Sequence, residues 1–121
     1  MYQFYFEKLE VWKDAIGFIK LIYRISRKFP DEEKFGIINQ LRRASLSVSS
    51  NISEGNSRRT KKDQGYFTNI AFSSLMEALS LVIVSYQLGY LSKENYIIVR
   101  HEIEKIANKL NALHKAQMNP R

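Results

Sequence analysis

The fold is decided by residues 64–92, QGYFTNIAFSSLMEALSLVIVSYQLGYLS, which carry a single formal charge, Glu77, in a chain that is 26% charged. An ordinary surface helix has one apolar stripe and one charged face, and this stretch has no charged face. Serine, asparagine and glutamine side chains interrupt it, so we do not expect the apolar run of about 20 residues that spans a membrane. The stretch predicts a helix that is covered on most sides, by its own bundle and by another copy of the chain.

The length of the chain, 121 residues, is typical of one domain, so we expect a single domain over residues 1–121. Apolar residues make up 45% of it, which is enough for a hydrophobic core. The absence of cysteine excludes disulfides, thiolate nucleophiles and cysteine metal sites. Residues 1–10 lack the basic and apolar regions of a signal peptide, and we expect a cytoplasmic protein.

Four segments with helical periodicity organise the chain. The first, from about residue 7 to 28, carries two adjoining apolar stripes, which indicates contact with two neighbours. Pro30 ends it, and the second helix is expected over about residues 31–53. The third is expected to end near Leu88, and the last to begin after Ser92 as N-cap. Four helices joined by short turns predict an all-α, up-down-up-down four-helix bundle.

Several residues mark the expected helix ends and faces. Gly55 is expected just beyond the second helix and Gly89 just beyond the third. Thr60 and Asp63 resemble a capping box at the start of the third helix. Phe35 is expected to begin the buried face of the second helix, and the serines that follow indicate close helix packing rather than a polar site.

Side chains that carry catalysis do not gather in this sequence. His101 and His114 are thirteen residues apart on the last helix and face different directions. Ile98 and Asn111 precede them by three residues, so the Glu-x-x-His motif of di-iron bundles is absent. The chain has neither a nucleophile elbow nor a phosphate-binding glycine loop. We therefore expect no enzyme activity, cofactor or metal; the alternative is an enzyme with a ligand in the bundle core.

Positive charge is concentrated in one part of the chain. The formal net charge is +7, and residues 34–62 hold seven cations against one anion, Glu54. Part of this charge follows the second helix at a turn, beside a helix N-terminus that attracts phosphate. The segment predicts salt-sensitive, sequence-tolerant binding of RNA or DNA. The alternative is a solvated basic turn that keeps the protein soluble. The candidate contact residues are Arg42, Arg43, Arg58, Arg59, Lys61 and Lys62.

Two carboxylates lie beside apolar segments. Glu77, on the covered third helix, needs a cationic partner or must take up a proton, and Arg42 and Arg43 are the expected donors. Glu54 is the second such carboxylate. We expect Glu54 and Glu77 to be structural buried charges that fix helix register, rather than groups that transfer protons.

Short motifs then occur in a characteristic order, and their spacing resembles one bacterial family. They are LEVW at residues 9–12, FP at 29–30, QLRRA at 40–44, NISEG at 51–55, RRTKK at 58–62 and LGY at 88–90. The family consists of four-helix bundles encoded in intervening sequences of 23S ribosomal RNA genes. The accessory variability protein of diversity-generating retroelements is similar to it. The resemblance spans nearly the whole chain and implies a bundle that assembles into a ring, typically a pentamer.

The two branches of this family differ in what they imply about partners. The retroelement branch implies a positive surface that binds nucleic acid and a reverse transcriptase, whereas the intervening-sequence branch has no assigned role. Ser50 stands where the family often has proline, and Ser73-Ser74 where it often has Gly-Ser, which leaves the branch undecided. We expect a non-enzymatic, self-assembling bundle that binds nucleic acid. The alternatives are a protein-interaction scaffold and a retroelement accessory protein.

Overall fold

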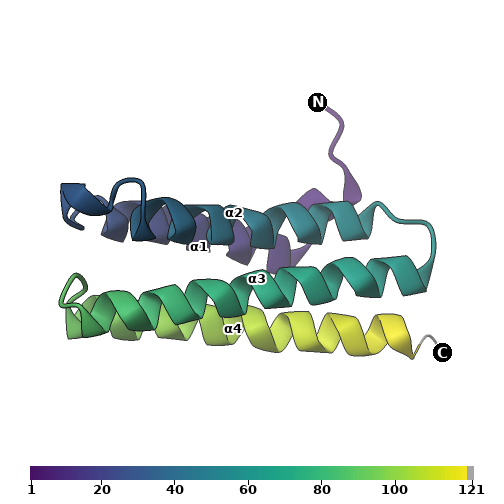
Figure 1. The fold of residues 1–121 in the computed structure, drawn as a ribbon. Coiled ribbons are helices and arrows are strands. Elements are labelled where there is room, and N and C mark those ends of the chain that lie inside the picture. The colour runs from purple at the N-terminus through teal and green to yellow at the C-terminus, as the bar shows by residue number, and fades with distance from the viewer. Residues whose placement is uncertain (120–121) are drawn as a thin grey trace.

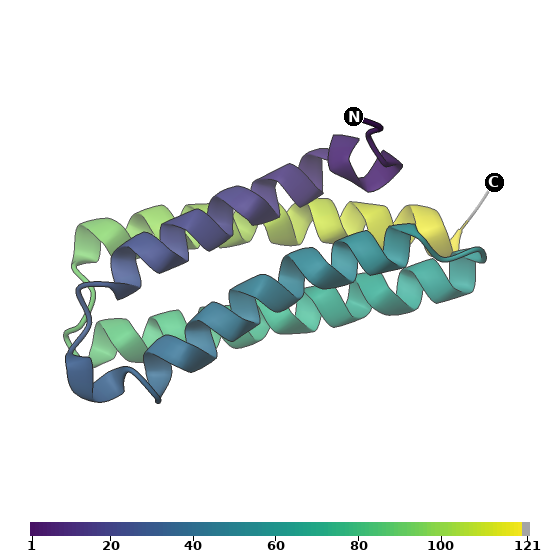
Figure 2. The ribbon, with the colours of Figure 1, turned by 90° about the horizontal axis from the view of Figure 1, so that it is seen from above.

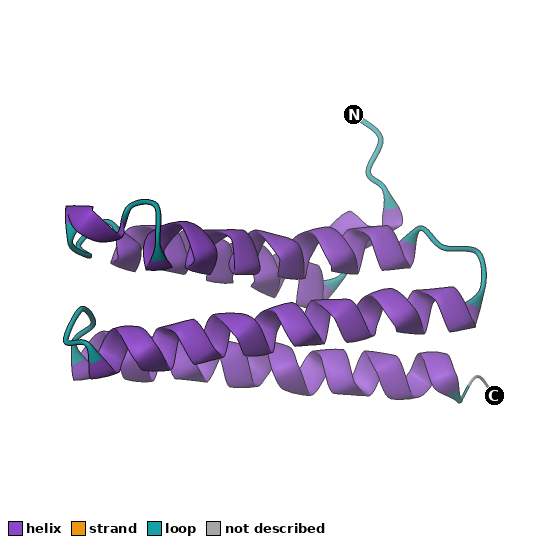
Figure 3. Cartoon of the chain, in the orientation of Figure 1, coloured by secondary structure: helices purple, strands orange, loops and turns teal. Residues whose placement is uncertain are grey.

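The computed structural model describes residues 1–119, and all regular structure in that range is helical (Figure 1, Figure 3). Two single turns of 3-10 helix accompany four long helices. The predicted all-α class is therefore confirmed. The elements are η1 (Tyr5–Lys8), α1 (Glu10–Ser26), η2 (Asp31–Glu33), α2 (Ile37–Asn56), α3 (Lys61–Gln87) and α4 (Lys93–Met118).

The four helices run alternately in opposite directions. Each helix packs against its neighbour in the chain, and α4 returns to pack against α1. Viewed from above, the start of α1, the end of α4 and the α2–α3 turn lie toward the same end of the bundle (Figure 2). This arrangement is the up-down-up-down four-helix bundle that the sequence predicts.

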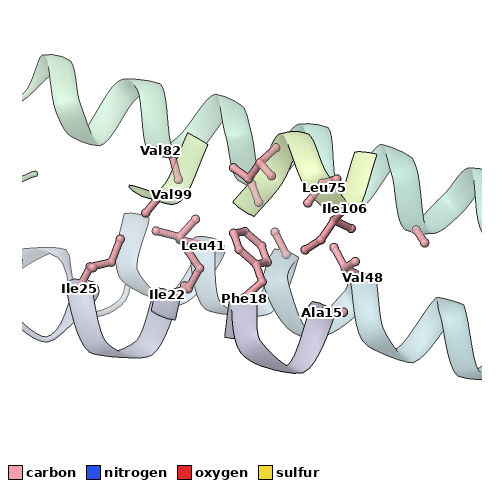
Figure 4. Close-up of a cluster of buried hydrophobic side chains, with 14 of the residues drawn as sticks. Ala15, Phe18, Ile22, Ile25, Leu41, Val48, Leu75, Val82, Val99 and Ile106 are labelled. Atoms are coloured by element: carbon pink, nitrogen blue, oxygen red, sulfur yellow. The ribbon is translucent and has the colours of Figure 1, made fainter. Parts of the chain in front are cut away.

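The core lies along the bundle axis, where all four helices contribute apolar side chains (Figure 4). Phe18 and Ile22 of α1 are fully buried there, and full burial of such side chains stabilises the fold by about 1.5–3 kcal/mol each. They belong to the second of the two predicted stripes of α1. All members of that stripe are buried, namely Val11, Ala15, Phe18, Ile22 and Ile25. The first stripe is only half-buried within one chain, namely Leu9, Trp12, Ile16, Ile19 and Tyr23.

The ends of α3 and the start of α4 have the predicted capping residues. The Thr60 hydroxyl accepts a hydrogen bond of 3.1 Å from the backbone N–H of Asp63, and Ser92 caps α4 in the same way. Gly89 has a φ of 81°, the left-handed conformation that favours glycine. The N–H of Tyr90 donates to the carbonyl of Ser85 at 2.9 Å, which completes a Schellman motif.

The start of α2 differs from the prediction. This helix begins at Ile37, and residues 31–33 form the separate turn η2. The Glu33 carboxylate accepts from the backbone N–H of Ile37 at 3.4 Å and from the Tyr90 hydroxyl at 2.9 Å, so it holds this turn in place. Phe35 lies between the two elements and is 88% exposed. The prediction that Phe35 starts the buried face of the second helix is therefore wrong.

The role predicted for Gly55 is also wrong. Gly55 lies inside α2, which ends at Asn56, and it is not in the left-handed conformation. A Cβ atom added at Gly55 would lie only 2.7 Å from the Cβ of Phe67 on α3. Glycine is required here because it lets α2 and α3 approach closely.

Serines line the same α2–α3 contact, as predicted. The hydroxyls of Ser47 on α2 and Ser74 on α3 are 2.8 Å apart and form a hydrogen bond. The Asn51 side-chain amide donates to the carbonyl of Ser47 at 2.8 Å. The buried hydroxyls of Ser45 and Ser49 bond to carbonyls of their own helix. Small, internally bonded side chains thus allow close packing without leaving buried polar groups unpaired.

Helix α3 is covered on one side only within a single chain. Its buried residues face α2, α4 and the core. The exposed residues of its opposite side include Tyr66, Asn69, Ser73, Glu77, Ser80 and Val84. By length and composition alone α3 could cross a membrane, because its most apolar 18-residue window has a mean hydropathy of 1.7. The prediction that the polar residues of this stretch exclude a membrane-spanning helix is therefore wrong by the criterion of length and composition. Core helices of globular proteins meet the same criterion.

Candidate nucleic-acid interface

The α2–α3 turn gathers four of the six candidate cations at one end of the bundle. Arg58, Arg59, Lys61 and Lys62 are all exposed there. The side-chain amide of Gln64 donates to the carbonyl of Arg58 at 2.9 Å, which ties the turn to the first turn of α3. These cations therefore stand on a backbone that is fixed from both helices.

Arg58 differs from the other three because it is already engaged. Its guanidinium lies 4.5 Å from the centre of the Phe67 ring and 3.0 Å from the Glu54 carboxylate. Arg59, Lys61 and Lys62 make no ion pair within 4.0 Å to any carboxylate of residues 1–119. These three residues are called the turn cations below, and they are the part of this end with uncompensated charge.

Arg42 lies elsewhere and has a structural role. Its guanidinium stacks on the Tyr23 ring at 4.5 Å and donates to the Ser26 hydroxyl at 2.9 Å, so it joins α2 to α1. The sixteen residues from Arg42 to Arg58 correspond to about 24 Å along α2. Among the six candidate contact residues, Arg42 therefore lies apart from the α2–α3 turn.

Arg43 and Glu77 line a surface cavity of about 320 Å³ between α2 and α3, together with Asn39, Gln40, Ala44 and Ser47. Among residues 1–119 no carboxylate forms an ion pair with Arg43, and no cation forms one with Glu77. Glu77 is exposed, and the side chain of Glu54 is 52% exposed. The prediction that Glu54 and Glu77 are buried is thus wrong for the single chain, because both point away from the core.

Shifted pKa values occur in structural contacts away from the turn. The Lys109 ammonium group donates hydrogen bonds to the Asp14 and Glu10 carboxylates, which raise the pKa of Lys109 and join α4 to α1. A hydrogen bond to Glu33 raises the pKa of Tyr90. Across residues 1–119, no three histidine, aspartate or glutamate side chains gather closely enough to hold a metal ion.

The fold and this surface define a class of protein: an all-α four-helix bundle whose α2–α3 turn presents free positive charge. The chain belongs to the family of 23S rRNA-intervening sequence proteins, whose family model matches residues 7–112. The family resemblance seen in the sequence motifs is thereby confirmed.

A solved structure supports the same fold. The chain is similar to a protein of unknown function from the S23 ribosomal protein family of Bacteroides thetaiotaomicron, with a TM-score of 0.80 and 22% identity. The match covers 87% of this chain and 98% of that one. A comparison with curated protein sequences found no match.

Proposed function

We propose that this chain is a non-enzymatic, cytoplasmic protein that self-assembles and binds RNA or DNA through the turn cations. The observation that carries the proposal is the uncompensated charge of Arg59, Lys61 and Lys62 on a fixed turn. Phosphate contacts from such side chains hold a nucleic acid in place without reading its sequence. Binding is therefore expected to be strong at low salt and to fall steeply as salt rises.

The test replaces Lys61 and Lys62 with glutamine and compares this variant with Lys34→Gln/Lys93→Gln. Both variants lose two positive charges, but the second pair is exposed on other segments of the chain. In a filter-binding assay with a 20-base-pair duplex, we expect the turn variant to lose about tenfold or more in affinity at 50 mM salt. Its log–log salt slope should become shallower by about 2, since each phosphate contact contributes about 0.9.

The outcomes of this assay separate the candidate functions. Equal losses in both variants would mean that only net charge matters, and unchanged binding would exclude the turn. If the unmodified protein binds neither RNA nor DNA at low salt, the better function is a protein-interaction scaffold.

Self-assembly is supported by two apolar faces that one chain leaves incompletely covered. One is the half-buried stripe of α1, which includes Ile16 and Ile19. The other lies on α3, where exposed Tyr66 and Val84 adjoin half-buried Ile70 and Leu81. A contact between two different faces repeats from copy to copy and closes into a ring when the rotation allows it. We propose such a ring, with five copies as the family resemblance implies.

Light scattering of the purified protein tests this assembly. We expect a mass close to five times 14.2 kDa at micromolar concentration. A mass of 14.2 kDa would contradict self-assembly, and another multiple would correct the ring size.

The resemblance also implies a reverse transcriptase as partner if the chain belongs to the retroelement branch. Gene neighbourhood separates the branches: a neighbouring reverse transcriptase gene favours this partner, and a position inside a ribosomal RNA gene disfavours it.

A further inference from the structure

A row of four cations lies on the side of α1 that faces away from the core. Lys13, Lys20 and Arg24 of α1 and Arg27 at its C-cap are all exposed, and these four residues are called the cationic row below. At 3.6 residues per turn they fall within an arc of about 60° around the helix. From first to last they extend over about 21 Å of helix length. The row is thus straight and narrow.

The two carboxylates of α1 lie outside this arc and are paired with α4. Asp14 accepts from the Lys109 ammonium group at 2.6 Å and lies 3.7 Å from that of Lys105, and Glu10 also bonds to Lys109. Among residues 1–119, the four cations of the row make no ion pair within 4.0 Å. The positive charge of the row is therefore not neutralised by its own helix.

Arg42 extends this charge from the neighbouring helix. Its two hydrogen bonds to α1, to the Ser26 hydroxyl and the Tyr23 carbonyl, place the guanidinium beside the end of the row that contains Arg24 and Arg27. A guanidinium has five N–H donors, so these bonds do not use all of them.

We propose that the cationic row binds the phosphate backbone of nucleic acid, as a second contact surface separate from the turn cations. Cations spaced along a straight helix suit a polymer whose phosphates repeat at regular intervals, and duplex DNA carries one negative charge per about 1.7 Å of its axis. None of the large apolar side chains that are exposed belongs to α1, so this face has no anchor for insertion into lipid. The inference rests on the proposed function only in taking nucleic acid as the ligand.

The test replaces Lys20 and Arg24 with glutamine in the full chain. The matched control is Lys20→Arg/Arg24→Lys, which changes the same positions but keeps both charges. With the 20-base-pair duplex at 50 mM salt, we expect Lys20→Gln/Arg24→Gln to lose about tenfold in affinity and about 2 in salt slope. The charge-keeping control should bind like the unmodified protein. Circular dichroism checks that both variants keep their helix content.

The comparison with the turn variant distinguishes the two proposals. If Lys61→Gln/Lys62→Gln loses affinity and Lys20→Gln/Arg24→Gln does not, the row is excluded and the proposed function stands. If only the row variant loses affinity, the row is the interface and the turn is not. An unmodified protein that binds no duplex at low salt overturns both. Row-dependent binding to phosphatidylserine vesicles, without an effect on the duplex, would replace nucleic acid by an acidic membrane.

Discussion

The contact between α2 and α3 and the contact between α1 and α4 hold the bundle together by different means. The first depends on size: Gly55 admits Phe67, and Ser47 bonds to Ser74. The second adds charge at its edge, where Lys109 bridges the α1 carboxylates. Close packing therefore fixes the distance between the backbones of α2 and α3. The ion pairs between α1 and α4 order side chains at the surface, where water partly screens their charges.

The largest expected effect comes from adding a methyl group at Gly55. The new Cβ of Gly55→Ala would meet the Phe67 Cβ at 2.7 Å, and neither atom can rotate away. Overpacking costs about 1–3 kcal/mol, which exceeds the gain of up to about 1 kcal/mol from the helix propensity of alanine. We expect a lower free energy of unfolding in urea denaturation.

Gly17→Ala is the matched control for this substitution. Gly17 lies on the exposed side of α1, and a Cβ added there would have no neighbour within 4 Å. Alanine should therefore stabilise this helix by about 0.5–1 kcal/mol. If Gly55→Ala and Gly17→Ala changed the free energy of unfolding alike, the α2–α3 contact would not depend on a close approach of the backbones at Gly55.

A smaller effect is expected from the ionic edge of the α1–α4 contact. The pKa of Lys109 is raised, so the folded state favours its charged form. Its contribution to stability is complete below the ordinary lysine pKa of about 10.4 and is lost as pH rises through the higher folded value. Lys109→Met should therefore reduce the loss of stability between about pH 9 and 12, as measured by urea denaturation at each pH.

Tyr90 must be controlled in this experiment. Its pKa is also raised, because its neutral hydroxyl donates to Glu33, and its contribution is likewise lost at alkaline pH. The measurement is therefore repeated in a Tyr90→Phe background. If the loss of stability at alkaline pH were the same in that background with lysine or methionine at position 109, the ion pairs of Lys109 would contribute nothing to stability.

Local signals predicted the helices and most of their ends. Thr60, Ser92 and Gly89 act through their own turns, so the sequence near each of them was sufficient. Phe35 and Gly55 were misassigned because their positions depend on distant partners. Tyr90 holds Glu33, which keeps the turn η2 separate from α2 and leaves Phe35 between them. Gly55 is packed against Phe67. Neither contact leaves a pattern in the adjacent sequence.

The candidate site was predicted in part, because charge was counted by segment rather than by helix face. The count found the turn cations but joined Arg42 to them, although Arg42 packs on α1. It missed the cationic row because residues 1–33 contain six basic and six acidic side chains. A helical projection of the sequence separates the cationic row from Glu10 and Asp14, so this projection could have predicted the row. The near absence of charge over residues 64–92 predicted a helix covered on most sides. In one chain, however, uncharged polar residues of α3 such as Asn69, Ser73 and Ser80 are exposed.

The even number of helices has a practical consequence for handling the protein. The start of α1 and the end of α4 lie at the end of the bundle that carries the α2–α3 turn (Figure 1, Figure 2). A purification tag attached beyond either of these helix ends would therefore lie near Lys61 and Lys62 and obstruct the anions that they attract. A fluorescent dye is better placed at the opposite end, in the loop around Gly89.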